Sequence, residues 1–147
     1  MRYGKRGSLW AWLALVFLVV PEGRAATTKI AVFRGTEIPF DLRSGDDIIK
    51  RGKYDLEVHF SKVDTNVLYI LRVMQKGKSI NEVPGQGIEY QAQTIQALMK
   101  DPKIPDKPTL RFRKIPETDI VDLIFEAGKT GNFSFMKALF RMKLIKE

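Results

Sequence analysis

Few residues of this chain could do chemistry, because it has no cysteine and its only histidine is His59. The lack of cysteine excludes a thiol nucleophile and a thiolate metal site. His59 alternates with Asp55 and Glu57 in a predicted strand, so the three side chains share one face. Same-face neighbours on a strand lie ~6.5–7 Å apart, which is too far for one metal ion unless a neighbouring strand adds ligands. These residues are therefore a candidate metal site that strand geometry disfavours, and a solvated face of paired charges is the competing interpretation.

Basic residues cluster more than acidic ones and give the candidate binding surface. Arg111 and Arg113 share one face of a predicted strand, and Arg141 and Lys143 share one face of another. If these strands are neighbours, the four cations form one basic face, which suits an anionic partner such as an envelope protein or an anionic surface. The aromatic residues of the same strands point to the opposite face. Nucleic acid is therefore not expected as the partner, since nucleic-acid binders place stacking rings on the basic surface.

The carboxylates form no defined catalytic pair. Glycoside hydrolysis needs two acids that face each other across a cleft, and the late acids Asp119, Asp122 and Glu126 are no better placed than earlier ones. A serine triad would have to use His59 as its base. The sequence therefore predicts a protein that is not an enzyme and has no cofactor. A small carboxylate-dependent hydrolase is the least favoured alternative.

The first 25 residues have the layout of a secretory signal peptide. A basic start precedes an apolar run over residues 9–20, and small residues before a cut after Ala25 complete the pattern. The run is shorter than the ~20 residues that cross a bilayer as a helix, which favours cleavage over an uncleaved anchor. We therefore expect residues 26–147 to form a single periplasmic or secreted domain with no transmembrane segment. Cleavage removes four basic residues and one acid, so the net charge falls from +8 to +5.

A hairpin over residues 52–77 is the clearest of the elements that must position these side chains. Its first strand alternates apolar with polar residues, as in a strand with one buried face (Tyr54, Leu56, Val58 and Phe60 against Asp55, Glu57 and His59). Its second strand, residues 66–75, is apolar on both faces, so we expect it to lie deeper in the sheet. The same signals predict strands at residues 29–34, 37–42, 79–83, 109–115 and 119–126, with Gly35 as a break between the first two.

One amphipathic helix is predicted at about residues 88–100, where five apolar side chains fall on one helical face (Ile88, Ala92, Ile95, Leu98 and Met99). Asp101-Pro102 ends it, because the residue before proline avoids the helical region. We expect this helix to cover one end or face of a sheet. Residues 133–145 fit a strand or a helix, and we favour the strand, which puts Arg141 and Lys143 together on one face.

These elements predict a mainly β fold, an antiparallel β-sandwich or partly open barrel of about seven strands with one short helix. The expected function is that of an exported, non-catalytic binding or interaction module, which uses the basic face or the opening between the sheets. The alternative is a carrier of a small apolar ligand, with the helix capping the mouth of the barrel. An interior too full for a ligand would favour the binding module. Asn132 begins an N-glycosylation pattern, which matters only in a source that has that machinery.

Overall fold

The computed structural model describes residues 27–91 and 94–146 of the chain. The predicted signal peptide, residues 1–25, lies outside the described residues. Within the described ranges, no helix has the length and apolar character needed to span a membrane. The elements are, in chain order, β1 (Thr28–Ile38), β2 (Leu42–Ser44), β3 (Asp47–Ile49), β4 (Gly52–Val63), β5 (Asn66–Gln75), β6 (Lys78–Gly87), α2 (Ile95–Lys100), β7 (Thr109–Lys114), β8 (Ile120–Glu126) and β9 (Lys137–Leu144).

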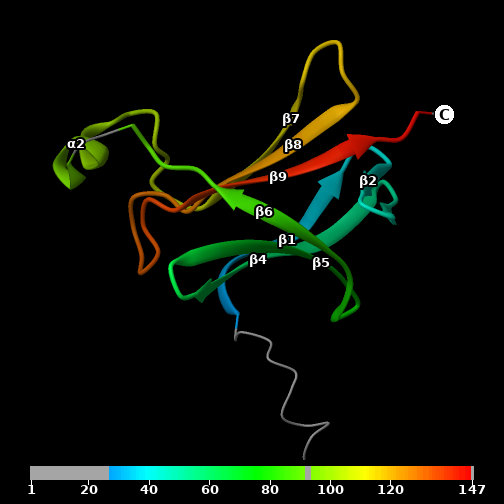
Figure 1. The fold of residues 1–147 in the computed structure, drawn as a ribbon, viewed down its shortest axis with the longest axis horizontal. Helices are drawn as coiled ribbons and strands as arrows, with labels where there is room; N and C mark the ends of the chain where they lie inside the picture. The colour runs from blue at the N-terminus through cyan, green and yellow to red at the C-terminus, as the bar shows by residue number, and fades with distance from the viewer. Residues whose placement is uncertain (1–26, 92–93, 147) are drawn as a thin grey trace, which may run out of the picture.

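Seven of these strands form a nearly closed antiparallel barrel, which confirms the predicted fold class (Figure 1). The strands pair in the order β1-β4-β5-β6-β9-β8-β7, and the β2–β3 hairpin joins the far end of β9. β6 pairs with β5 along most of its length and with β9 only at Gln86 and Gly87, so it crosses from one layer to the other. This crossing places β7, β8 and β9 in one layer, opposite β1, β4 and β5.

The interior of the barrel is filled by the inward-facing side chains of both layers. In β4, Tyr54, Leu56 and Val58 are buried, as the alternation predicts, and in β8 Val121 and Leu123 face them from the other layer. Each such side chain stabilises the fold by ~1.5–3 kcal/mol when it is fully buried. The alternation fails at the end of β4, where Phe60 is only partly buried and His59, on the other face, is buried. The rings of Phe33 in β1 and Phe125 in β8 meet edge to face with centroids 6.1 Å apart, so the two layers are in direct contact.

Close packing also explains a glycine at the point where β6 changes layers. A Cβ atom added at Gly85 would collide with the ring of Phe140, which is fully buried in β9. Only a residue without a side chain lets the two strands approach so closely. The interior therefore has no free space at this crossing.

β5 lies between β4 and β6, as expected for the more apolar strand of the central hairpin. Its second apolar face is not covered, however, because no further layer packs on this side of the barrel within the described residues. Leu68 is 47% exposed, and Ile70 and Met74 are only partly buried. The apolar character of both faces correctly indicated a central strand but not a strand buried on both sides.

Gly35 does not end the first strand, so that expectation is wrong. β1 continues to Ile38 through an irregularity in its register between Phe33 and Thr36. Gly35 has φ +59°, a conformation that glycine adopts without steric cost, and its N–H donates to the Asp55 carboxylate at 2.8 Å. The glycine thus marks a bulge rather than a break.

The helix α2 confirms the predicted element but begins at Ile95, later than the periodicity indicated. The N–H of Ile88 donates to the Lys137 carbonyl at 2.9 Å, so pairing with β9 keeps this part of the chain extended. Thr94 is the N-cap, and its hydroxyl accepts a hydrogen bond from the Ala97 N–H at 3.1 Å. No residue of α2 is buried, and Ile95 is 70% exposed. The helix therefore does not cover a sheet, and Figure 1 shows it at the end of an arm beside the barrel.

Residues 137–144 form strand β9, which confirms the preference for a strand in the ambiguous C-terminal region. β9 pairs with β8 from Lys137 to Lys143, which is all of the strand except its last residue. The residues before it form a turn in which Phe135 has φ +62°. Asn132 is exposed in this loop.

Candidate anion-binding face

The barrel brings the four predicted binding residues onto one surface, the outer face of β7, β8 and β9. Arg113 and Arg141 lie on either side of Asp122 in the register of the three strands, and Lys143 lies beside Ile120. Arg111 is two residues from Arg113 and so on the same side of β7. The sequence had placed each pair on one strand face, and the structure supplies the missing fact that β8 joins them. We call this surface of Arg111, Arg113, Arg141 and Lys143 the basic face.

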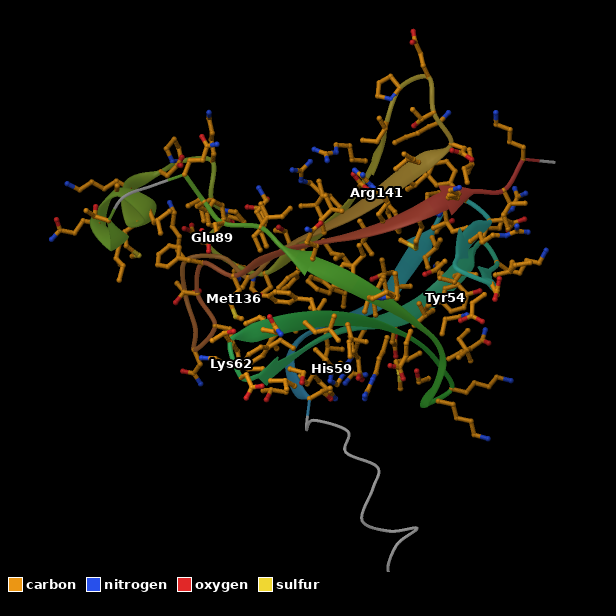
Figure 2. The ribbon with its side chains drawn as sticks, in the orientation of Figure 1. Tyr54, His59, Lys62, Glu89, Met136 and Arg141 are labelled. Atoms are coloured by element: carbon orange, nitrogen blue, oxygen red, sulfur yellow. The ribbon has the colours of Figure 1, made fainter. Side chains whose placement is uncertain are left out.

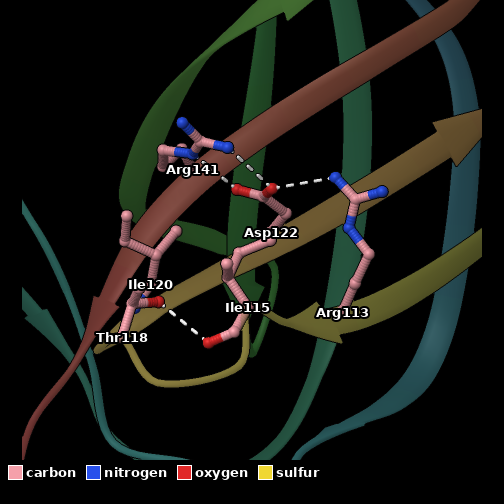
Figure 3. A network of polar contacts seen from close by, with 6 residues as sticks. All are labelled: Arg113, Ile115, Thr118, Ile120, Asp122 and Arg141. Atoms are coloured by element: carbon pink, nitrogen blue, oxygen red, sulfur yellow. Dashed lines mark hydrogen bonds and ion pairs between the residues drawn. The ribbon is translucent and has the colours of Figure 1, made fainter.

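Asp122 organises the centre of the basic face (Figure 3). Its carboxylate is fully buried and accepts two hydrogen bonds from Arg141, from Nε at 2.8 Å and from an Nη at 3.0 Å. Arg113 donates a third from an Nη at 3.1 Å. A charge-assisted, bidentate contact of this kind fixes the plane of the guanidinium group as well as its position. Asp122 therefore holds both arginines in defined orientations.

The two arginines remain available to a ligand although they are held by Asp122. Their side chains are 48% exposed in Arg113 and 57% exposed in Arg141. Most of the N–H donors of each guanidinium are not used in the bonds to the carboxylate. In Figure 3 one nitrogen of Arg141 points away from Asp122. The pair is thus an ordered set of donors at the surface.

The contact between Asp122 and Arg141 favours the charged form of both groups. Hydrogen bonds from Arg141, and then from Arg113, hold the pKa of the Asp122 carboxyl below its ordinary value, although burial acts in the opposite direction. The same contact raises the pKa of the Arg141 guanidinium. With Lys137 on the same side of β9, five cations surround two carboxylates, Asp122 and Glu126, which leaves an excess of three positive charges. The surface as a whole attracts anions.

The second carboxylate, Glu126, anchors the chain that follows β6. Its Oε2 accepts a hydrogen bond from the Tyr90 hydroxyl at 2.7 Å, and its Oε1 lies 4.0 Å from Nε of Arg111. Burial and then the hydrogen bond to Glu126 raise the pKa of the Tyr90 hydroxyl, so it stays protonated and donates. The Lys137 ammonium lies 5.2 Å from the centre of the Tyr90 ring. These contacts fix residues 88–90 along one edge of the basic face.

Several hollows adjoin this surface, including a hollow of about 310 Å³ beside Lys143 that Arg43 and Asp119 also line. Two more involve β6. One, of about 330 Å³, lies between β6 and β9 and is lined by Pro84, Gly85, Gln86, Ile88, Leu139 and Arg141. The other, of about 510 Å³, lies at the end of the barrel where Leu98 of α2 approaches Val67, Tyr69 and Met136. Neither is the enclosed barrel interior, which is occupied by side chains.

The candidate metal ligands lie on the other layer, on the outer side of β4, and Figure 2 shows His59 and Arg141 on opposite sides of the barrel. One nitrogen of His59, Nε2, lies 2.9 Å from the Glu57 carboxylate, and the other, Nδ1, lies 3.4 Å from the Thr27 hydroxyl. His59 and then Lys29 lower the pKa of Glu57 by hydrogen bonding. Glu57 and His59 thus come together and already have partners.

Asp55, the third candidate ligand, has different partners from the other two. It accepts the hydrogen bond from the Gly35 N–H and lies 3.8 Å from the Arg34 guanidinium. Within the described residues, no group of three side chains of the metal-ligating types is close enough to hold an ion. The outer face of β4 is therefore a network of paired charges.

Among the acids weighed for hydrolysis, Asp122 and Glu126 lie on the same strand and are paired with basic or hydroxyl groups, so they do not face each other across a cleft. No family model matches this chain, and neither a curated protein nor a solved structure is similar enough to count as a match.

Proposed function

We propose that this chain is an exported, non-catalytic binding module that attaches to an anionic surface through its basic face. The observation behind the proposal is the buried Asp122, which orders Arg113 and Arg141 while leaving both guanidinium groups half exposed. Ordered donors lose less conformational freedom on binding than free arginine side chains do. The excess of positive charge on the same face adds long-range attraction to an anionic surface. Export is supported by the signal-peptide pattern of residues 1–25.

The packed interior favours this proposal over the apolar-ligand carrier. A carrier needs an apolar cavity that encloses most of its ligand. The interior of this barrel is crossed by the contact between Phe33 and Phe125, and at Gly85 it has no room for a methyl group. The carrier remains the second candidate because of the hollow of about 510 Å³ at the end of the barrel, which Leu98 lines from the helix.

A charge-reversal experiment tests the proposal. The double variant Arg111→Glu/Lys143→Glu reverses two charges of the basic face without altering the contacts of Asp122. The matched control, Lys62→Glu/Lys78→Glu, makes the same change in net charge at exposed positions on the β4 and β6 side of the barrel. Binding is measured by co-sedimentation with phosphatidylglycerol vesicles at low and at high salt.

We expect the control to bind these vesicles like the unmodified protein and the basic-face variant to lose most of its binding. An attraction worth about 1 kcal/mol per basic residue near an anionic membrane predicts, for two reversed charges, a loss of at least about thirtyfold. Added salt should weaken the binding of the unmodified protein, since exposed charges are screened. Equal losses in the two variants, or no binding by the unmodified protein, would overturn the proposal.

A further inference from the structure

The hollow beside Arg141 differs from the rest of the basic face, because a cation and an apolar wall meet there. Arg141 contributes the part of its guanidinium that Asp122 does not use. Leu139 lies two residues before it on the same side of β9, and the hollow is also lined by Pro84 of β6 and by Ile88, which follows β6. Both Leu139 and Ile88 are only partly buried. The hollow thus has a charged end and an aliphatic wall.

The position of the hollow follows from the path of β6. β6 and β9 pair at Gln86 and Gly87 and then separate, since no further pair links them toward Lys78. The space between the diverging strands is about 330 Å³, at the lower end of the range for small-molecule sites. The exposed amide side chain of Gln86 lies at this branch point and adds a hydrogen-bonding group.

These features define the ligand chemistry. Arginine pairs with a carboxylate through two parallel N–H donors, and Arg141 is already held in a fixed plane by Asp122. A purely ionic ligand would leave the aliphatic wall in contact with water. A neutral apolar ligand would offer no acceptor to the N–H donors of Arg141 that Asp122 does not use. A ligand with a carboxylate at one end and a short aliphatic chain fits both ends of the hollow.

We propose that the hollow lined by Arg141, Leu139, Ile88 and Gln86 is a specific site for an aliphatic carboxylate, with the carboxylate on Arg141 and the chain against Leu139 and Ile88. This inference rests on the proposed anion-binding role of the basic face and names the ligand class for one part of it. Arg111 and Lys143 attract the anionic surface in general, while Arg141 and the apolar wall select one amphiphile.

The probe is octanoate, titrated into the isotopically labelled full chain while amide NMR signals are followed. Saturable shifts are expected at Gln86, Ile88, Leu139 and Arg141. Octylammonium, which has the same chain with the opposite charge, and octanol, which has no charge, should not produce them. Saturable shifts with octanol at the same residues would show that the chain alone binds and would overturn the inference.

Two isosteric variants provide the matched comparison. Gln86→Glu places a carboxylate next to Arg141, where it competes with the ligand, and should weaken octanoate binding at least about tenfold, the loss expected for a hydrogen bond to a charged group. Gln96→Glu makes the same change on the exposed helix α2 and should leave the affinity unchanged. Equal weakening by both variants, or shifts centred on Leu98, would overturn the inference.

The outcomes separate this inference from the proposed function. Vesicle binding that depends on Arg111 and Lys143, without saturable octanoate binding, would overturn the carboxylate site alone. In the opposite outcome, Gln86→Glu weakens octanoate binding but the charge reversal at Arg111 and Lys143 leaves vesicle binding unchanged. That result would overturn only the proposed attachment of the basic face to an anionic surface.

Discussion

Replacing Asp122 by asparagine tests whether one buried carboxylate organises the basic face. The substitution keeps the size of the side chain, so it removes the charge without creating a cavity. Removing one partner of a buried ion pair costs ~3–5 kcal/mol when the remaining charge stays buried. Here Arg113 and Arg141 are about half exposed and can turn toward water, so the free energy of unfolding should fall by about 2–3 kcal/mol.

Urea denaturation followed by circular dichroism measures this loss, with Asp119→Asn as the control. Asp119 lies just before β8 on the same segment, and its side chain makes none of the contacts that hold Asp122. The control should unfold at the same urea concentration as the unmodified protein. The Asp122→Asn variant should unfold at a lower one, with an unchanged slope.

The pH dependence of the same measurement gives a second readout. The pKa of Asp122 is lowered by Arg141 and Arg113, so its stabilisation is fully present above the pKa of an unfolded aspartate, ~3.9. It is lost as the pH falls from there through the lower pKa of the folded state. The difference between the two proteins should therefore be constant from about pH 7 to about pH 5 and shrink below about pH 4. A difference of less than about 0.5 kcal/mol at neutral pH, typical of an exposed ion pair, would refute this role of Asp122.

Two further predictions concern the packing and the edge of the basic face. Gly85→Ala should lower the free energy of unfolding by about 1–3 kcal/mol in urea denaturation, because its methyl group collides with Phe140, and an unchanged stability would contradict the close packing of β6 and β9. Tyr90→Phe should cost about 1–2 kcal/mol through the lost hydrogen bond to Glu126. In the unmodified protein, Tyr90 and Tyr69 should both resist ionisation in an absorbance titration, because burial raises the pKa of each hydroxyl and the hydrogen bond to Glu126 raises that of Tyr90 further. Tyr90→Phe should remove the contribution of Tyr90 and leave that of Tyr69.

Much of the fold could be predicted because its strands have strong local patterns. The alternation through Tyr54, Leu56 and Val58 correctly identified the buried face of β4, and the apolar run after Asp119 correctly identified β8 as a strand inside the sheet. The same period of two correctly favoured a strand over a helix for β9. Successive side chains of a strand point to opposite faces of the sheet. Burial of one face therefore produces an alternation of apolar and polar residues that can be read directly from the sequence.

The elements that differed from prediction depend on long-range contacts. Helical periodicity extended back to Ile88, but the hydrogen bond from Ile88 to Lys137 belongs to a strand pair separated by a large part of the chain. Gly35 was expected to end a strand, whereas the Asp55 carboxylate on the neighbouring strand stabilises a bulge there. The propensities of neighbouring residues along the chain do not indicate which distant residues will form these hydrogen bonds.

The basic residues of the candidate site could be predicted from the sequence, but the role of Asp122 at its centre could not. Arg111 with Arg113, and Arg141 with Lys143, were grouped correctly because each pair lies on one strand. That the two pairs lie on one surface follows only from the strand order, in which β8 lies between β7 and β9. The sequence suggests Asp122 only as a possible catalytic acid, although an acid inside the apolar run of β8 is itself a signal of a buried ion pair.

The proposed binding of an anionic partner through the basic face is tested most directly by an amide NMR titration of the full chain with dihexanoyl phosphatidylglycerol, a soluble lipid with the headgroup of the vesicles. We expect the perturbed amides to lie at Arg111, Arg113, Arg141 and Lys143. Perturbations centred instead on the exposed apolar residues Leu68 and Ile95 would contradict it, and so would a spectrum that does not change.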